Sequence, residues 1–268
     1  MIWQCPHCHL PLSPGRHSWR CENLHSFDVA REGYVNLLPV QQKRSREPGD
    51  VPAMLQARRR FLEAGHYRPL TEAINAFLPY VAGRQLLDVG SGEGYYTRQL
   101  HIAGWPQDAL AGVDIAKAGA RLAAKGLPGA QYVVASSREL PLAGDSVDHL
   151  LRIFAPAAAG ELHRVVNPGG SLLDVAPGPE HLWPLKQALY PRARTHAPPK
   201  PLSGFTPIME MRCCFPFTLR GRDAIGDFLA MTPFAWKGSA EVRRELELRE
   251  SLQLEADFVV RKLVTQKK

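Results

Sequence analysis

From residue 85 onward, short apolar segments alternate with segments of helical pattern, and this alternation limits the possible folds more than any other feature of the chain. The expected strands are QLLDVG (85–90), LAGVDIA (110–116), AQYVVAS (130–136), VDHLLRIFAP (147–156) and SLLDVAP (171–177). Helices are expected over 95–104, 118–126 and 158–166, followed by a turn at 167–170 (NPGG). Strands separated by helices form a parallel, doubly wound sheet. The predicted fold class is therefore α/β, and such a sheet binds its ligand at the carboxyl ends of its strands.

The first of these strands ends in a glycine-rich turn, LLDVGSGEGYY. A dinucleotide-binding fingerprint requires G-x-G-x-x-G, and its last glycine is replaced here by tyrosine. The D-x-G-x-G-x-G pattern resembles motif I of class I S-adenosylmethionine-dependent methyltransferases, in which the backbone of this loop approaches the methionine part of the cofactor. The carboxylate of Asp114, at the end of the second strand, can accept two hydrogen bonds from ribose hydroxyls. The cofactor-binding residues expected here are Asp88, Gly90, Gly92, Gly94 and Asp114.

A second motif lies at the N-terminus, where cysteines and a histidine follow the spacing C-x2-C, twelve residues, C-x3-H. The residues are Cys5, Cys8, Cys21 and His25. Two close pairs of such ligands suit tetrahedral Zn²⁺, and a set of three cysteines and one histidine leaves no open position, so this zinc would be structural. A redox CxxC is the rival interpretation, but such motifs usually begin a helix. His7 and His9 compete for the fourth position, and the spacing of the second pair favours His25.

The remaining segments are less specific. Residues 51–81 follow a helical pattern that breaks near Gly65 and Pro69. Residues 192–205, RARTHAPPKPLSGF, are expected to form a long basic loop, followed by a helix over 222–234 and a strand over 253–264. Cys213 and Cys214 are adjacent in an apolar stretch, MRCCFPF, and are expected to be buried strand residues.

The net charge of +7 is unevenly distributed. Residues 1–60 carry nine Lys/Arg and five Asp/Glu, residues 186–222 carry seven and one, and the intervening residues 61–185 carry nine and twelve. Two basic segments therefore flank a mildly acidic centre. They indicate either a polyanionic partner such as nucleic acid or merely a soluble basic surface. A cluster of Lys43, Arg44 and Arg46 is either an RNA contact or a solvated linker.

The chain is expected to contain three parts: a zinc-binding, RNA-recognition domain over residues 1–40, a linker and helices over 41–80, and a methyltransferase domain over 81–268. No stretch approaches the 18 consecutive apolar residues of a transmembrane helix. The first residues, MIWQCPHCHL, do not follow the pattern of a signal peptide. We therefore expect a cytoplasmic protein.

A narrower resemblance extends along the chain. The segments CPHCH…CENLHSFDVAREGYVNLLP, KRSREPGD, AGHYRPL, GSGEGYYT, ASSRELP, RIFAP and PGPEHL occur in this order. Together they resemble the bacterial 23S ribosomal RNA (guanine-N1)-methyltransferases. The resemblance implies that the zinc domain grips a hairpin of 23S rRNA, that the second domain binds S-adenosylmethionine, and that the protein is a homodimer. It also implies that Tyr67, Gly94, Tyr95 and His181 contact the cofactor.

Methyl transfer to guanine N1 requires loss of the N1 proton, which a base can remove or a cation can favour by stabilising the N1/O6 anion. Arg152, in the fourth strand, is the candidate for the cation, although it could equally form a structural salt bridge. The three alanines 157–159 that follow RIFAP offer no polar group to the base. The alternatives are a methyltransferase acting on tRNA or a small molecule, and a non-catalytic zinc-dependent RNA-binding protein.

Overall fold

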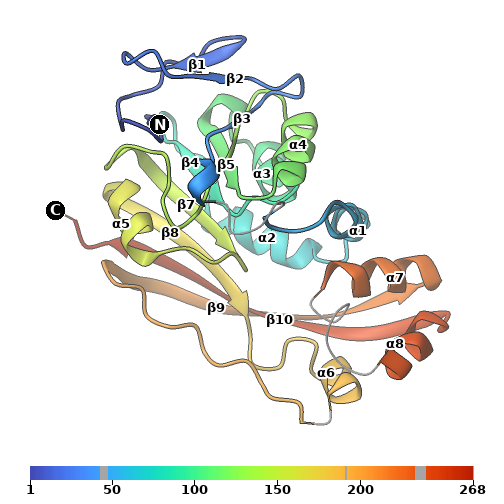
Figure 1. Ribbon diagram of the computed structural model, residues 1–268. Helices are drawn as coiled ribbons and strands as arrows, with labels where there is room; N and C mark the ends of the chain where they lie inside the picture. The colour runs from blue at the N-terminus through green and yellow to red at the C-terminus, as the bar shows by residue number, and fades with distance from the viewer. Residues whose placement is uncertain (43–47, 191, 233–239, 268) are drawn as a thin grey trace.

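The computed structural model describes residues 1–42, 48–190, 192–232 and 240–267, so the expected basic cluster Lys43, Arg44 and Arg46 lies outside the described residues. Within them, an eight-stranded sheet has the strand order β3-β6-β5-β4-β7-β8-β10-β9 (Figure 1). In that order the strands span Tyr34–Asn36, Gln131–Val134, Leu110–Asp114, Leu86–Val89, Val147–Ile153, Val166–Pro177, Ser251–Thr265 and Phe205–Arg220. The first six run parallel, whereas β10 is antiparallel to both neighbours. The predicted doubly wound α/β class is confirmed.

The central strands align the places where functional groups were expected. β4 is buried along its whole length, as is typical of a parallel strand covered on both faces. In its register, Val89 lies opposite Val113 of β5 on one side and Arg152 of β7 on the other. The glycine loop after β4, Asp114 at the end of β5 and Arg152 near the end of β7 therefore meet at one edge of the sheet.

Helices cover the sheet (Figure 1). They are α1 (Pro52–Glu63), α2 (Arg68–Phe77), α3 (Tyr95–Ile102), α4 (Lys117–Gly126), α5 (Ala159–Val165), α6 (Trp183–Leu189), α7 (Arg222–Met231) and α8 (Ala240–Glu247), with 3-10 turns η1 (Val40–Gln42) and η2 (Gln107–Ala109). The predicted break between α1 and α2 occurs at Gly65, whose φ is +80°. Pro69 lies in the first turn of α2, where its missing N–H costs no helical hydrogen bond. No helix among the described residues is both long and apolar enough to cross a membrane.

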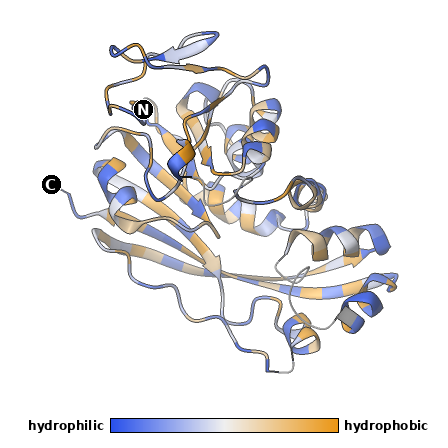
Figure 2. Ribbon diagram, viewed as in Figure 1, coloured by the Kyte–Doolittle hydropathy of each residue, from blue (hydrophilic) through white to orange (hydrophobic). Residues whose placement is uncertain are grey.

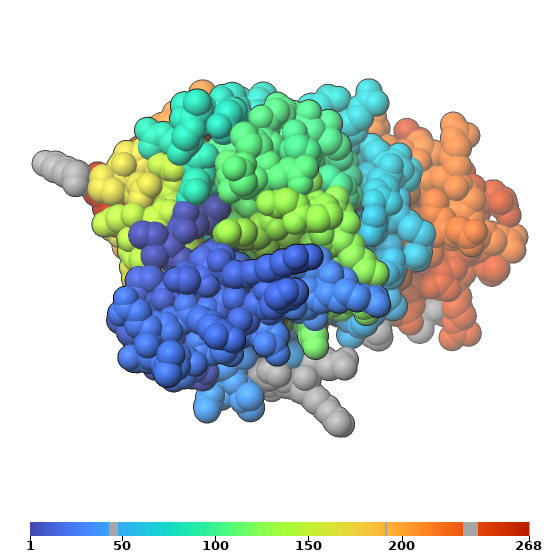
Figure 3. Space-filling model, turned by 90° about the horizontal axis from the view of Figure 1, so that it is seen from above, coloured from blue at the N-terminus to red at the C-terminus, as the bar shows by residue number. Residues whose placement is uncertain are grey.

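The N-terminal segment packs onto the sheet. Its hairpin, β1 (Ser18–Arg20) and β2 (Ser26–Asp28), lies above the sheet in Figure 1, and the space-filling view shows the segment, in blue, as a lobe against the green core residues (Figure 3). Trp3 is almost fully buried, pairs with Leu142 and packs on Trp19, with ring centroids 5.6 Å apart. The segment then enters the sheet itself as edge strand β3. The metal motif is thus anchored to the same apolar cluster as Leu87 of β4.

Two expectations need correction. The expected turn at 167–170 (NPGG) is part of strand β8, which begins at Val166. The pairing of β8 with β7 is irregular at this point, because Val147 pairs with Val166 whereas His149 pairs with Ser171. Cys213 and Cys214 do lie in a strand, β9, but Cys213 is only half-buried and Cys214 is exposed. β9 is the edge strand of the sheet, and from Met211 to Arg220 its side chains are alternately more buried and more exposed, so Cys214 faces water. Figure 2 shows hydrophilic and hydrophobic residues interspersed along this strand. The expected loop over 192–205 is confirmed up to Gly204, where β9 follows.

Candidate metal centre and cofactor site

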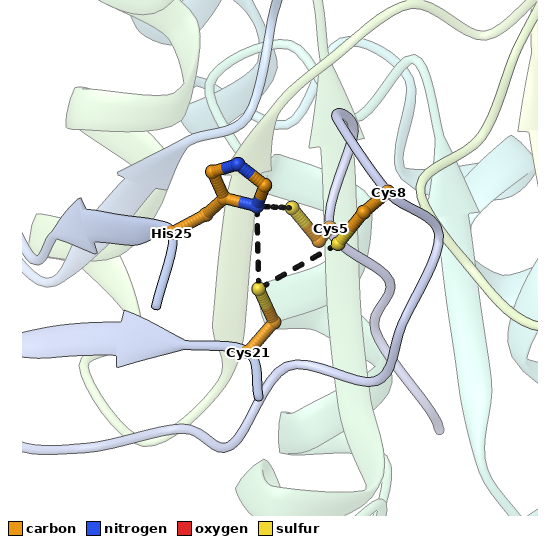
Figure 4. A group of neighbouring side chains, drawn as sticks. All are labelled: Cys5, Cys8, Cys21 and His25. Carbon is orange, nitrogen blue, oxygen red and sulfur yellow. Dashed lines mark hydrogen bonds between the residues drawn. The ribbon is translucent and has the colours of Figure 1, made fainter. Parts of the chain in front are cut away.

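The four expected metal ligands come together although they lie on different turns. The ligand atoms of Cys5, Cys8, Cys21 and His25 all lie within 4.8 Å of one another, and Figure 4 shows their side chains pointing toward a common centre. The Cys8 and Cys21 sulfurs are 3.7 Å apart. The His25 Nδ1 lies 3.5 Å from the sulfurs of both Cys5 and Cys21. The predicted pairing of the two motifs into one site is confirmed.

These separations fit a zinc ion. With Zn–S distances of about 2.3 Å, tetrahedral geometry places two sulfurs about 3.7 Å apart, and a sulfur and an imidazole nitrogen slightly closer. The observed distances match these edges. A hydrogen bond from the backbone at Leu10 is the largest of the effects that lower the pKa of the Cys8 thiol to about 7, which favours the thiolate. His7 and His9 are both exposed, and His25 lies with the three cysteines, as the spacing of the second pair favours.

The glycine loop requires its glycines. Gly90, Gly92 and Gly94 have φ values of +81°, +54° and +80°, in the left-handed region that other residues rarely adopt. A Cβ on Gly90 would lie 2.3 Å from the Cβ of Ala155, and a Cβ on Gly94 would lie 2.7 Å from that of Ala123. At these three positions the loop therefore presents backbone at the end of β4, which is the surface that a close-fitting cofactor needs.

Asp114 links this loop to β5. Its Oδ2 accepts a hydrogen bond from the Gly92 N–H at 2.8 Å, and its Oδ1 accepts one from the Ala116 N–H at 2.7 Å. Burial raises the pKa of Asp114, and the two backbone donors oppose that rise. Because each carboxylate oxygen can accept a further hydrogen bond, the group remains able to bind two hydroxyls.

Two other carboxylates lie inside the loop region. The Asp88 Oδ2 accepts a hydrogen bond from the Thr97 hydroxyl at 2.7 Å, which ties β4 to α3, and burial raises the Asp88 pKa to about 7. Burial also raises the pKa of Glu93 to about 7, and its Oε2 has no hydrogen-bond partner among the described residues. Sequence reasoning missed Glu93, because a charged residue within a glycine loop reads as solvent-facing.

Tyr67 and His181 meet in an aromatic cluster although 114 residues separate them. Their ring centroids are 6.4 Å apart, and both rings pack on Phe258 of β10. Burial, followed by the charges of His196 and Lys186, lowers the pKa of His181 to about 3, so its imidazole is neutral. The Asp257 N–H donates to His181 Nδ1, which leaves the proton on Nε2. Tyr95 begins α3 and is also buried, with its ring against Tyr96 and Arg98.

Arg152 has the salt bridge that was considered for it. Its guanidinium donates to Asp174 Oδ1 of β8 at 2.7 Å, while Arg261 of β10 donates to the other oxygen at 2.6 Å. Arg152 also lines an open hollow of about 440 Å³ together with Arg138, Pro156, Ala157 and Ala158. The sequence contains no sign of the Asp174 partnership, because it depends on the β7–β8 register.

Comparisons with known proteins agree with this site. Residues 3–46 match the zinc-ribbon family model described as "RlmA, N-terminal", and residues 87–174 match "Methyltransferase domain". The chain is 36% identical over 242 residues to the 23S rRNA (guanine(748)-N(1))-methyltransferase of Streptomyces fradiae, an alignment that covers 87% of this chain and 85% of the relative. It is 31% identical over 253 residues to YxjB of Bacillus subtilis (strain 168), provisionally named a 23S rRNA (guanine-N(1)-)-methyltransferase, with 88% and 87% covered.

Among solved structures, the YcgJ protein of Bacillus subtilis matches 76% of this chain and 100% of its own, with a TM-score of 0.49 and 14% identity. The sequence relatives cover most of the chain, and the two family models cover the metal centre and the glycine loop. The resemblance drawn from the motifs is thereby confirmed: the chain belongs to the bacterial 23S rRNA (guanine-N1)-methyltransferase family.

Proposed function

We propose that this protein methylates N1 of a guanine in a hairpin of 23S ribosomal RNA, using S-adenosylmethionine. The observation that carries the proposal is the combination in one body of a Cys3His metal centre and a methyltransferase glycine loop, with the N-terminal segment entering the catalytic sheet as β3. The names of the relatives support the substrate class.

Bound S-adenosylmethionine supplies an electrophilic methyl group, so the residues of the chain need mainly to position donor and acceptor. In this proposal the glycine loop contacts the methionine part through its backbone, and Asp114 binds the ribose hydroxyls. The Tyr67 and His181 rings form an apolar wall, and the neutral His181 avoids repelling the positive sulfonium. Asp88 acts through Thr97 to hold the loop.

The guanine must be activated, because its N1 carries a proton and is a poor nucleophile. Arg152 is proposed to stabilise the developing N1/O6 anion from the hollow beside Ala157 and Ala158. Asp174 fixes the guanidinium of Arg152 for that purpose. N1 is hidden within a base pair, so the target base must lie in a loop or leave its stack.

The zinc is proposed to have a structural role. It holds the hairpin that follows the first ligand pair, and this hairpin exposes Arg16, His17 and Arg20. These side chains are proposed to contact RNA phosphates and bases. Trp19 of the same hairpin is buried against Trp3 and supports the packing of the segment.

The organisation proposed for the protein is a zinc domain over residues 1–40, a linker with helices over 41–80 and a methyltransferase domain over 81–268. A homodimer would place the basic segments of two chains around one RNA. A cytoplasmic location fits an enzyme that acts on ribosomal RNA.

The deciding experiment is reverse-transcription mapping of 23S rRNA from cells with and without the gene, since N1 methylation blocks Watson–Crick pairing and stops the polymerase. We expect a polymerase stop at one guanine in cells that carry the gene and no such stop in cells that lack it. The stop should return when the wild-type protein is supplied, but not when the Asp114→Ala variant is supplied. An unchanged 23S pattern, with a stop lost from tRNA instead, would reassign the substrate. Calorimetric titration with S-adenosylmethionine excludes the non-catalytic alternative if binding is seen.

A further inference from the structure

Beside the glycine loop lies an ion pair that belongs to none of the motifs described above. Arg58 of α1 donates from Nη2 to Asp50 Oδ2 at 2.6 Å, and neither side chain is fully buried. Asp50 belongs to the short segment that precedes α1. The pair is therefore preformed and still accessible from solvent.

The position of this pair is fixed by contacts on both sides. The Arg58 Nη1 lies 3.5 Å from where a Cβ on Gly92 would stand, so the guanidinium faces the middle of the loop. On the other side, Gly49, with φ of +90°, packs so closely on the residues after β5 that an added Cβ would lie 2.7 Å from the Cβ of Ala116. The segment carrying Asp50 thus crosses the end of β5 next to Asp114.

The charges around the loop confirm how close these groups are. Beside the dominant effect of burial, the charges of Arg98, Arg58 and Arg59 act to lower the pKa of Glu93. The Asp50 charge acts to raise the pKa of Asp114, and the Arg58 charge acts to lower it. The neighbouring arginines have another partner: Arg59 and Arg98 both pair with Glu63 on the outer side of α1. Arg58 is the arginine of α1 that both faces Gly92 and acts on Asp114.

An arginine and a carboxylate side by side are the charge complement of an amino acid's own ammonium and carboxylate. The planar guanidinium can bind a carboxylate through two parallel hydrogen bonds, and a carboxylate is the natural partner of an ammonium group. The Ser91 Oγ and Glu93 Oε2 atoms of the glycine loop are buried, so the loop presents mainly the backbone of its glycines next to the pair. We propose that Arg58 binds the α-carboxylate, and Asp50 the α-ammonium, of the amino-acid end of S-adenosylmethionine.

This inference rests on the proposed function and names the part of the site that recognises one end of the cofactor. It assigns to the segment before α1, which follows the metal domain, a direct part in cofactor binding. Asp114 would bind the ribose, so the two groups divide the ligand between them.

The test is calorimetric titration of the purified zinc protein with two ligands. S-adenosylhomocysteine carries the amino-acid end, whereas 5′-methylthioadenosine keeps the adenosine and a thioether but lacks that end. We expect Arg58→Met and Asp50→Asn each to weaken S-adenosylhomocysteine binding by about 10- to 100-fold, as for lost hydrogen bonds to charged groups, and to leave methylthioadenosine binding unchanged.

Two controls give the contrast. Arg59→Gln removes the neighbouring arginine of the same helix and should change neither ligand's affinity. Asp114→Ala should weaken both ligands, because both contain the ribose. Unchanged methylthioadenosine binding also shows that an Arg58 or Asp50 variant is folded.

Equal losses for both ligands in Arg58→Met and Asp50→Asn would overturn the proposal and make the pair a support of the loop. If these two variants bound both ligands as the wild-type protein does, the proposal would be overturned as well, and the Arg58–Asp50 pair would be only a surface salt bridge. Failure of the proposed function is distinguishable: a protein that does not use S-adenosylmethionine would bind neither ligand even as wild type, whereas a wrong RNA substrate would appear in the reverse-transcription mapping and leave both affinities unchanged.

Discussion

The Asp114 carboxylate accepts a hydrogen bond from the backbone N–H of Gly92 at 2.8 Å, so the end of β5 holds the middle of the loop that follows β4. One side chain thereby couples the two strands between which the cofactor is proposed to lie. Its other oxygen accepts a hydrogen bond from the N–H of Ala116, the residue just before α4. Loss of this carboxylate must affect both the binding surface and the shape of the loop.

Replacing Asp114 by alanine should weaken S-adenosylmethionine binding by about 1.5–3 kcal/mol, as expected for lost hydrogen bonds to a charged group. Titration calorimetry measures this directly. Asp114→Asn retains one oxygen acceptor and should lose less affinity. Asp108→Ala, at an exposed site before β5, serves as the matched control and should bind normally. An Asp114→Ala protein with wild-type affinity would remove Asp114 from the cofactor site.

Zinc content should depend on Cys21 and not on Cys214. Purified, chelator-washed protein should keep about one zinc equivalent, because the Cys3His set is closed and its binding energy contributes to folding. Cys21→Ser should lose zinc, unfold at lower temperature and lose activity on RNA while still binding S-adenosylmethionine. Cys214→Ser changes an exposed cysteine of β9 and should keep full zinc. Metal analysis and thermal unfolding decide the matter, and full zinc in Cys21→Ser would contradict the ligand assignment.

Glu93 should contribute a fall in the stability of the protein between about pH 5 and pH 7. Burial raises its folded-state pKa from 4.5 to about 7, so the folded protein binds more protons than the unfolded chain in this window. Stability therefore decreases as pH rises through it, and is constant for this group above it. Glu93→Gln should remove about 2–3 kcal/mol of that decrease, since one pKa unit corresponds to about 1.4 kcal/mol.

Urea unfolding at pH 5 and pH 8 measures this contribution as a difference of differences between variant and wild type. Both proteins carry the same metal centre, so its own pH dependence cancels. Glu72→Gln, at an exposed carboxylate of α2, should leave the difference unchanged. The same difference in Glu93→Gln as in wild type would show that Glu93 is not the titrating group.

A feature could be predicted from the sequence when residues close together in the chain determine it, and not when it depends on the packing of distant segments. The metal ligands were predictable because four residues within 21 positions form both pairs, and the strands around the glycine loop because each is a continuous apolar run. The contact between Tyr67 and His181 was accessible only through family resemblance, since it depends on how α2 and β10 pack.

Other features escaped prediction for definite reasons. The exposure of Cys214 follows from β9 being the edge of the sheet, and edge position is a property of strand order rather than of local composition. The pairing of Arg58 with Asp50 was hidden because a charged residue on a helix usually faces solvent. Asp174 lies opposite Arg152 only through the β7–β8 register, in which the shift after Val147 could not be foreseen.

Variants of Arg152 and Asp174 can separate a structural role of their salt bridge from a catalytic role of Arg152. Asp174 is buried between two arginines, so Asp174→Ala should destabilise the protein by about 3–5 kcal/mol, the typical cost of leaving buried charges without a partner. Arg152→Gln should destabilise less, because Arg261 continues to pair with Asp174. We expect its kcat to fall strongly at neutral pH, with cofactor affinity intact, and to recover partly at alkaline pH, where guanine N1 loses its proton unaided. A uniform loss at all pH values would favour a purely structural salt bridge.

The last prediction concerns the salt dependence of RNA binding. Each phosphate neutralised by a lysine or arginine releases counterions, so the logarithm of affinity falls with the logarithm of salt concentration, by about 0.7–0.9 per contact. Arg16 and Arg20 are exposed on the hairpin that the zinc ligands hold. Replacing both by alanine should therefore flatten the slope by about 1.4–1.8, and replacing Lys43, Arg44 and Arg46 together should flatten it further.

Arg68→Ala provides the control, since Arg68 is an exposed arginine of α2 outside both basic segments and should leave the slope unchanged. Cofactor binding should be unaffected in every variant, because none of these side chains belongs to the proposed cofactor site. If the Arg16/Arg20 variant kept the wild-type slope, the zinc hairpin would act through packing rather than through RNA contact. If the wild-type slope were itself near zero, RNA would be the wrong substrate class, because no enzyme that grips a phosphate backbone through arginines can avoid releasing its counterions.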